Sequence, residues 1–334
     1  MATDTAAVHD EVHENDQDMW SGGKEPFKAS YGKLMMWYFL LSDAFTFAGF
    51  LIAYGALRFS SPTWPVPDFV FSTAPFGIHH APLIFVTVMS FLLIISSVTM
   101  VRAVQEGHRE NQSGVVFWMF LTIIGGAGFL GCQAWEWNNL INKEYMTVTR
   151  NPFGTHAENG TYLNADGSQS TAADDQFKPG MGYLIHHAHV GEDGAHGHGE
   201  GELTAEENFL EDANNAVAAA NLDMANLPDK GVDFPGFKLN NEGFIQRKFV
   251  TESGVSAIQE YGPKAFGALF FFITGFHGFH VLSGVFLLVI IMLNAAGGIY
   301  VARKNGYEMV EKIGLYWHFV DLVWVFVFLV FYLL

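Results

Sequence analysis

Ionisable side chains stand inside two of the most apolar stretches of the chain. His277 and His280 lie in FFFITGFHGFHVLSGV (270–285), and His318 and Asp321 lie in YWHFVDLVW (316–324). Imidazole and carboxyl groups need hydrogen-bond partners, which hydrocarbon does not offer. Residues three apart on a helix share one face, so each stretch can direct a polar pair towards the interior of a bundle. The pattern favours imidazole–carboxylate contacts that are structural or handle protons.

The composition indicates that these stretches cross a membrane. Half of the 334 residues are hydrophobic and 15% are charged. Five apolar stretches are long enough to span a hydrocarbon layer of about 30 Å. They are Leu34–Leu57, Ala81–Val104, Val115–Leu140, Ala265–Leu293 and Ile313–Leu334. The predicted fold is all-α, a polytopic membrane bundle of five helices with a long external insertion between the third and fourth.

The charges near the ends of the spans predict an orientation. The first thirty residues are acidic and lack the basic-then-apolar layout of a cleaved signal, so we expect the N-terminus to stay inside. Basic residues are more frequent on that side, which agrees with the positive-inside rule. The inner set is Lys24, Lys28, Lys33, Arg102, Arg109, Arg303, Lys304 and Lys312, and the outer set is Arg58, Lys143, Arg150 and Lys264. Five spans then place the C-terminus outside. The expected location of the protein is the inner membrane of a bacterium.

Four segments follow from this topology. An acidic tail (1–33) lies inside, three helices occupy 34–141, the external insertion occupies 142–264, and two helices occupy 265–334. The insertion carries nineteen Asp or Glu residues against eight Lys or Arg residues, which argues against nucleic acid as a partner.

The insertion is rich in Asn, Asp, Gly, Ser and Ala, so much of it is expected to be loop-like. One exception is the segment after Thr204, where Thr204 and Glu207 have the spacing of a capping box and predict an amphipathic helix. A tract before it offers nitrogen ligands for Zn²⁺ or Cu²⁺, but its glycine content favours a solvated, unliganded state. The weak metal candidates are His186, His187, His189, His196 and His198.

A helical rise of 1.5 Å per residue converts sequence position into depth. Asp43 lies roughly 14 Å from the inner end of the first span. His277 and His280 lie ~12 and ~8 Å above the inner boundary, and His318 and Asp321 lie roughly 8 and 12 Å above it. The five residues are therefore expected to form one polar layer in the inner half of the membrane. Glu136 is expected at the outer interface.

A redox centre is the competing interpretation of the histidines. His280 and His318 are the best pair for a bis-histidine haem, as in a free-standing b-type cytochrome. The surrounding phenylalanines and the nearby Asp321 favour hydrogen bonding instead. A dinuclear copper centre needs paired cysteines, and Cys132 is the single cysteine. The sequence also lacks the inverted repeat typical of a secondary transporter and any evident nucleophile motif, so no catalytic site is predicted in this chain.

The same segments carry a family resemblance. The stretches Gly267–Leu288 and Glu311–Phe328 resemble the last two spans of subunit III of cytochrome c oxidase, in the haem-copper terminal oxidase family. WYFLLSDAFTFAGF around Asp43 is similar to an earlier span of that family with a buried carboxylate, and GCQAWEW, with Gln133 and Glu136, resembles its Gln-x-x-Glu signature. The resemblance covers most of the membrane part and implies a five-span form in which Glu311 is also a signature polar residue.

The resemblance implies a function and partners. Such a chain would be an accessory subunit with no haem or copper of its own, docked on the catalytic subunit and the copper- or donor-binding subunit that hold those groups. It would bind phospholipid and support proton uptake. The resemblance does not cover the insertion, whose acidity and size lead us to expect that it contacts a larger respiratory assembly or a cytochrome domain. The electron donor stays open, because quinol oxidases and nitric oxide reductases have similar accessory subunits.

Overall fold

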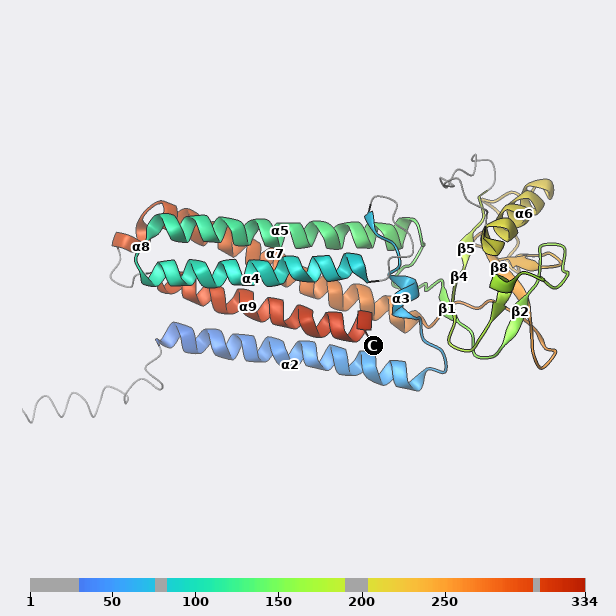
Figure 1. Ribbon diagram of the computed structural model, residues 1–334, viewed down its shortest axis with the longest axis horizontal. Helices are drawn as coiled ribbons and strands as arrows, with labels where there is room; N and C mark the ends of the chain where they lie inside the picture. Colours follow the sequence, from blue (N-terminus) through green and yellow to red (C-terminus); the bar gives the residue numbers. More distant parts are fainter. Residues whose placement is uncertain (1–29, 76–82, 190–203, 303–306, 334) are drawn as a thin grey trace, which may run out of the picture.

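The computed structural model describes residues 30–75, 83–189, 204–302 and 307–333. Its two parts are an elongated helical bundle and a smaller domain at one end of it (Figure 1). The bundle consists of α2 (Tyr31–Ser60), α4 (Ile84–His108), α5 (Gln112–Asn142), α7 (Lys264–Ala296), α9 (Glu308–Phe328) and its π-helical continuation η4 (Leu329–Leu333).

The predicted membrane bundle is confirmed. In the described part of the chain, five helices are long and apolar enough to cross a membrane, and α9 with η4 counts as one of them. Their bounds agree with the predicted spans to within a few residues, although the predicted ends Ala81 and Leu334 lie outside the described residues. The two short helices α3 (Pro67–Val70) and α8 (Ile299–Ala302) lie at opposite ends of the bundle (Figure 1).

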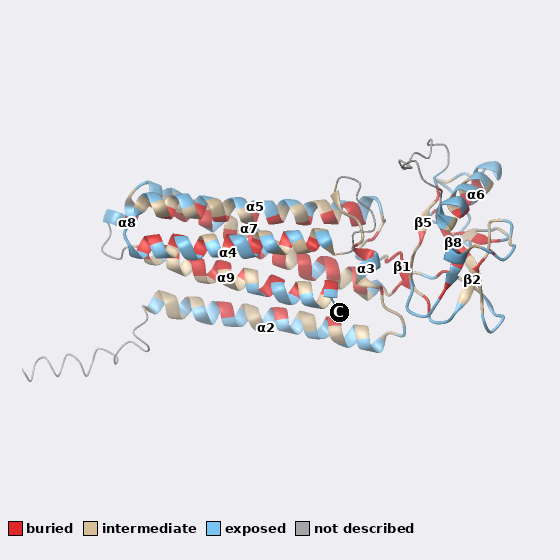
Figure 2. Cartoon of the chain, viewed as in Figure 1, coloured by how far each residue is buried: buried red, intermediate tan, exposed pale blue. Residues whose placement is uncertain are grey.

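The helices do not pack equally. α4, α5, α7 and α9 lie against one another, whereas α2 runs along α9 and α7 at the edge of the bundle (Figure 1). α2 buries only Leu40, Phe47 and Tyr54, which are spaced seven residues apart and form one narrow stripe. Most of its remaining surface is exposed (Figure 2).

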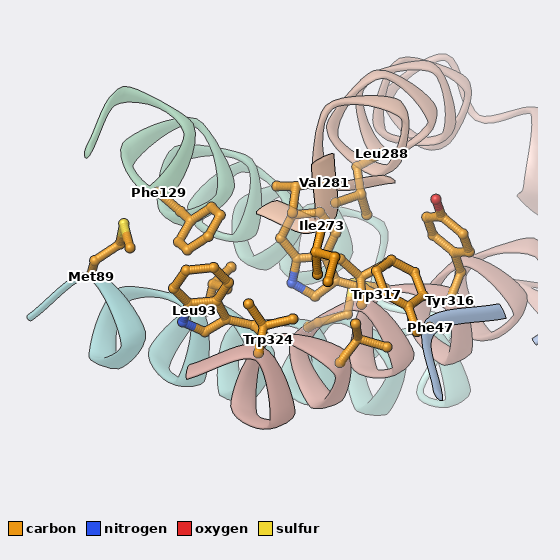
Figure 3. Close-up of a cluster of buried hydrophobic side chains, with 14 of the residues drawn as sticks. Phe47, Met89, Leu93, Phe129, Ile273, Val281, Leu288, Tyr316, Trp317 and Trp324 are labelled. Atoms are coloured by element: carbon orange, nitrogen blue, oxygen red, sulfur yellow. The ribbon is translucent and has the colours of Figure 1, made fainter. Parts of the chain in front are cut away.

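Trp317 is the central packing residue of the bundle (Figure 3). Its indole lies between two glycines, so that a Cβ added at Gly126 would stand 2.5 Å from the ring and one at Gly284 would stand 3.1 Å from it. The indole nitrogen donates to Ser96 Oγ at 3.1 Å. Small residues thus let α5 and α7 approach the large side chain of α9 closely, as is usual where helices pack in lipid.

The external insertion contains a folded domain, although many of its described residues lie in turns and loops, as expected. The antiparallel sheet is centred on β8 and has the order β3-β2-β8-β7-β6, with β5 and β9 also paired to β8. Its strands are β2 (Gly160–Tyr162), β3 (Gln176–Phe177), β5 (His186–His187), β6 (Val232–Asp233), β7 (Phe237–Leu239), β8 (Phe244–Thr251) and β9 (Ser256–Ile258).

These strands are too short to show a clear alternation of apolar and polar residues. The domain also contains the 3₁₀ turn η3 (Ala173–Asp175) and the helix α6 (Ala205–Ala219). The predicted capping box is confirmed, because Thr204 Oγ1 accepts from the Glu207 amide and the Glu207 carboxylate accepts from the Thr204 amide. α6 buries Phe209, Ala213 and Val217 against the sheet.

A two-stranded ribbon of β1 (Phe153–Thr155) and β4 (Gly182–Leu184) joins the domain to the bundle. Thr155 Oγ1 donates to the Trp64 carbonyl at 2.7 Å, and the Phe153 ring meets the Phe69 ring of α3 edge-on. The domain is therefore fixed to one end of the helices by polar and aromatic contacts.

Candidate functional site

The Asp43 carboxylate and the His280 imidazole form a pair between α2 and α7. Asp43 Oδ2 and His280 Nε2 are 3.2 Å apart, and the side chains are 17% and 10% exposed. The other ring nitrogen of His280, Nδ1, lies 2.8 Å from the Phe276 carbonyl oxygen. A carbonyl can only accept, so Nδ1 carries a proton and donates it.

This geometry assigns one exchangeable proton to the pair. With Nδ1 protonated, a hydrogen bond between Asp43 and His280 Nε2 requires one further proton, held by either partner. The pair is thus either a neutral carboxylic acid with a neutral imidazole, or a carboxylate with an imidazolium. The predicted contact of carboxylate and imidazole is found here, between helices that are distant in sequence.

His277 lies one helical turn from His280 on α7 and has different surroundings. It is fully buried, and neither ring nitrogen has a hydrogen-bond partner among the described residues. Its ring lies 5.2 Å from the ring of Trp324 and packs edge-on against Phe129 at 5.7 Å. Phe47 contacts the rings of both His277 and His280, so one residue of α2 covers the pair of histidines.

His318 and Asp321 meet at Ser97 of α4. His318 Nδ1 lies 2.6 Å from Ser97 Oγ, and the Ser97 side chain also interacts with the Asp321 carboxyl group. Asp321 Oδ1 is buried without a hydrogen-bond partner in the described structure. The expected direct contact of His318 with Asp321 is replaced by this shared serine, because neighbours on one helix face can both turn towards an adjacent helix.

The five predicted residues therefore do not form one hydrogen-bonded layer. Asp43 and His280 form one group at the α2–α7 contact, and Ser97, His318 and Asp321 form another at the α4–α9 contact. Aromatic rings surround His277, including that of Trp324, which Figure 3 shows within the apolar core. Sequence reasoning missed Ser97, since a serine in an apolar helix gives no signal of its partner.

The signature residues Gln133 and Glu136 lie on α5, nearer the external domain. Glu136 is 5% exposed and accepts a hydrogen bond from the Tyr332 hydroxyl of η4 at 3.0 Å. It lines a cavity of about 10 Å³ with Asn139, which is room for about one water molecule. Gln133 is also buried, and its amide oxygen and nitrogen both lack partners in the described part of the chain.

Glu311 is at the other end of the bundle. Its carboxylate pairs with Lys33 of α2 at 2.7 Å, and both side chains are about 30% exposed. Glu308 accepts from Ser30 and lies 3.3 Å from Lys312. These contacts fix the start of α2 to the start of α9, which indicates a structural role for Glu311.

The external histidines that the structure describes do not form a metal site. His186 pairs with Glu206 at 3.0 Å, and His187 stacks on Tyr145. His189 lies near His187, whereas His196 and His198 lie outside the described residues. Within the described residues, no group of three or more His, Cys, Asp or Glu side chains is placed to hold a metal ion.

Comparison with known proteins assigns the C-terminal segment. Residues 252–334 match the family model of cytochrome c oxidase subunit III, and this segment contains α7, α9 and η4. This C-terminal segment of the chain is thus similar to subunit III of cytochrome c oxidase.

The proteins that this chain is similar to carry two kinds of name. A cytochrome c oxidase subunit 3 from Dictyostelium discoideum is 40% identical over 79 residues, or 20% of this chain and 18% of the relative. One from Schizophyllum commune is 46% identical over 69 residues, which cover 21% and 25% of the two chains. A quinol oxidase subunit 3 from Bacillus subtilis is 31% identical over 110 residues, covering 33% and 49%. The chain thus matches about a fifth of the two cytochrome c oxidase subunits and half of the quinol oxidase subunit.

Proposed function

We propose that this chain is an accessory, non-redox subunit III of a haem-copper terminal oxidase, bound to the catalytic subunit and the donor-binding subunit. One observation carries the proposal. The segment that matches the family is the one that places His277, His280, His318 and Asp321. The haem and copper belong to the partner subunits, and this chain contributes binding surface, phospholipid contacts and proton handling.

The Asp43–His280 pair supports the proton-handling part of the proposal. It shares one exchangeable proton and is still partly exposed, so it can receive a proton and pass it on. A haem between His280 and His318 is less consistent with the geometry. His280 uses both ring nitrogens, and its ligation would break the contact with Asp43.

The first test is purification of the chain with its companions from native membranes. The companion subunits should include the haem- and copper-binding chains, and the isolated chain should be colourless above about 350 nm, where haem absorbs. A stoichiometric haem band in the isolated chain would contradict the proposal.

The second test uses Asp43→Asn in the whole complex. Asparagine keeps the size and a hydrogen bond to His280 but cannot exchange a proton at neutral pH. The haem spectra should be unchanged, while oxygen-reduction turnover or its lifetime should fall. Ser42→Ala is the matched control, since within the described residues the Ser42 hydroxyl bonds only the Phe39 carbonyl of α2. Equal turnover of Asp43→Asn and the control would limit the pair to a structural role.

The electron donor has two candidates. Cytochrome c is the donor in the name of the matched family, whereas the quinol oxidase subunit of Bacillus subtilis covers a larger share of this chain than the other two relatives described above. The purified complex should be assayed with reduced cytochrome c and with a quinol. If cytochrome c is the donor, the complex should be active with reduced cytochrome c only. If a quinol is the donor, it should be active with the quinol only.

The proposed location is the inner membrane of a bacterium, with the N-terminus inside and the C-terminus outside. The acidic insertion would then face the outer side and dock a basic or cytochrome-containing partner. Surface charge acts mainly on the rate of encounter, so docking should weaken with added salt. Deletion of 183–202 with unchanged assembly and unchanged salt dependence of electron input would assign that tract no role in docking.

A further inference from the structure

The external domain encloses a cavity of about 210 Å³. It lies among β4, β8, η3 and α6, and Phe69 of α3 contributes to its wall. Pockets for drug-sized ligands measure about 300–1,000 Å³, so this one suits a smaller molecule. None of the polar residues in the bundle contributes to it.

Aromatic side chains dominate the wall. The rings are those of Phe69, His156, Tyr162, Phe177, Tyr183 and Phe209. The protein already places a cation against two of them, since the Arg247 guanidinium lies 4.5 Å from the ring centre of Tyr162 and 4.1 Å from that of Phe209. Aromatic faces attract cations through the ring quadrupole, so this wall favours positive charge.

The charges at the cavity have the complementary sign. The lining contains the carboxylates of Asp174, Asp175 and Glu206 against the single guanidinium of Arg247. Arg247 is neutralised by a two-bond contact with Asp175 at 2.6 and 2.8 Å. Glu206 faces His186, which leaves the exposed Asp174 as the carboxylate with no hydrogen bond or ion pair among the described residues.

His156 adds no positive charge to this wall. Burial lowers the pKa of its imidazole to about 4, and its ring stacks on Phe177 at 3.5 Å. It is therefore a neutral aromatic ring at neutral pH. The cavity combines ring faces, an excess of carboxylates and no unpaired cation of its own.

We propose that this cavity binds a small organic cation of the quaternary ammonium or alkylamine class. The apolar groups of such a cation would contact the rings, and its charge would be balanced by the unpaired carboxylate of Asp174. A small anion would meet the excess of carboxylates. A bare metal ion would find no group of three or more His, Cys, Asp or Glu side chains placed to hold it among the described residues.

Calorimetric titration of the complex in nanodiscs tests the charge preference. Choline chloride is one probe, and 3,3-dimethyl-1-butanol is the other, because it has the same shape with a neutral carbon in place of the nitrogen. Choline should bind at least about fivefold more tightly, which corresponds to a cation–π contribution of about 1 kcal/mol. Equal binding of the two, or no choline binding up to about 10 mM, would overturn the proposal.

Three substitutions locate the site. Asp174→Asn removes the unpaired carboxylate and Phe69→Leu removes a ring face while keeping apolar bulk. Each should raise the Kd for choline by about two- to fivefold. Glu211→Gln is the control, since Glu211 is an exposed carboxylate of α6 that does not line the cavity. An unchanged Kd in both cavity variants, or an equal rise in the control, would contradict the assignment.

The lipid of the nanodisc separates two sources of such a cation. In discs of phosphatidylglycerol alone, no ammonium headgroup competes with choline. Addition of phosphatidylcholine should leave the apparent Kd unchanged if the cation comes from solution, and should raise it if a lipid headgroup fills the cavity. Hydrogen exchange of β8 in every variant checks that the domain stays folded.

Discussion

The membrane bundle and the external domain differ in how completely their buried polar side chains are hydrogen-bonded. In the external domain, Arg247 donates to both oxygens of Asp175 and to the Leu163 carbonyl. In the bundle, both ring nitrogens of His277 and both amide atoms of Gln133 are buried without partners in the described structure. The bundle, which is the more apolar of the two regions, thus contains the buried polar side chains that lack hydrogen bonds.

This difference separates structural polar groups from candidates for function. A fully bonded buried pair needs nothing further from its surroundings. A buried group without a partner carries a free-energy cost of about 1–3 kcal/mol unless water, lipid or another subunit completes it. The comparison therefore points to the bundle as the place where other components act, and to the Arg247 network as the support of the external fold.

The largest expected effect comes from breaking that network. Asp175→Ala leaves the Arg247 guanidinium buried without its counter-ion and should destabilise the external domain by about 3–5 kcal/mol. Hydrogen exchange should show faster exchange in β2, β7 and β8, with little change in the bundle helices. The test uses the whole complex.

Two controls accompany Asp175→Ala. Lys248→Met removes the pair of the partly buried Lys248 with the exposed Asp233 and the hydrogen bond from Lys248 to the Phe234 carbonyl, and should cost less than Asp175→Ala. The double variant Asp175→Leu/Arg247→Met should recover much of the loss, because two apolar side chains need no partner. Equal exchange in Asp175→Ala and Lys248→Met would show that the buried Arg247 network stabilises the external domain no more than the partly exposed Lys248 pair does.

The next effect depends on pH and also belongs to the external domain. The pKa of His156 is lowered by burial to about 4 from 6.5, so the unfolded domain takes up the proton first as the pH falls. Protonation of His156 therefore does not lower the free energy of unfolding of the domain above about pH 6.5. As the pH falls towards 4, it lowers this free energy by roughly 3 kcal/mol. Tyr162 and Tyr183, which face the ring, do not titrate in this range.

The substitution His156→Gln should flatten this pH dependence. Hydrogen exchange of β2 and β8, corrected for the intrinsic effect of pH on exchange, gives the stability at each pH. The unaltered domain should lose protection between pH 6.5 and 4, and the variant should lose less. Parallel curves for the two proteins would show that His156 is not the titrating group.

The sequence predicted the bundle well because lipid imposes a strong condition on it. A helix that crosses a membrane must be apolar over about twenty residues, and this signal does not depend on distant contacts. The contact of Asp43 with His280 could also be predicted from the sequence, since the depth of each residue in the membrane can be counted from the ends of its span. The partner of His318 could not be predicted in this way, because the rotation of α9 that directs His318 towards Ser97 is set by packing.

The external domain was harder to predict for the opposite reason. Its strands are two to eight residues long, and their pairing is set by contacts such as that of Arg247 with Asp175, 72 residues apart. The helix α6 was recognised because the bonds between Thr204 and Glu207 are local. The cavity was missed because its lining comes from segments between Phe69 and Gln259.

A third prediction examines the packing of the bundle. Gly126→Ala places a methyl group 2.5 Å from Trp317 and 2.8 Å from Val285, and should cost about 1–3 kcal/mol by overpacking. Gly131→Ala is the matched control on the same helix, since nothing lies within 4 Å of its added Cβ. Thermal stability of the complex should fall in the first variant only. An equal fall in both would indicate a general effect of substituting glycine in α5.

The smallest effect tests the polar group at the α4–α9 contact. Hydrogen bonds between membrane helices contribute about 0.6 kcal/mol on average, so the double-mutant cycle of Ser97→Ala with His318→Phe should give a coupling near that value. The cycle of His318→Phe with Asp321→Leu should give less, because the structure places Ser97 between the two residues. Thermal unfolding of the complex provides the free energies. A larger coupling between His318 and Asp321 than between Ser97 and His318 would restore a direct imidazole–carboxylate pair. The bundle would then satisfy this histidine with a charged partner, as the external domain does for Arg247.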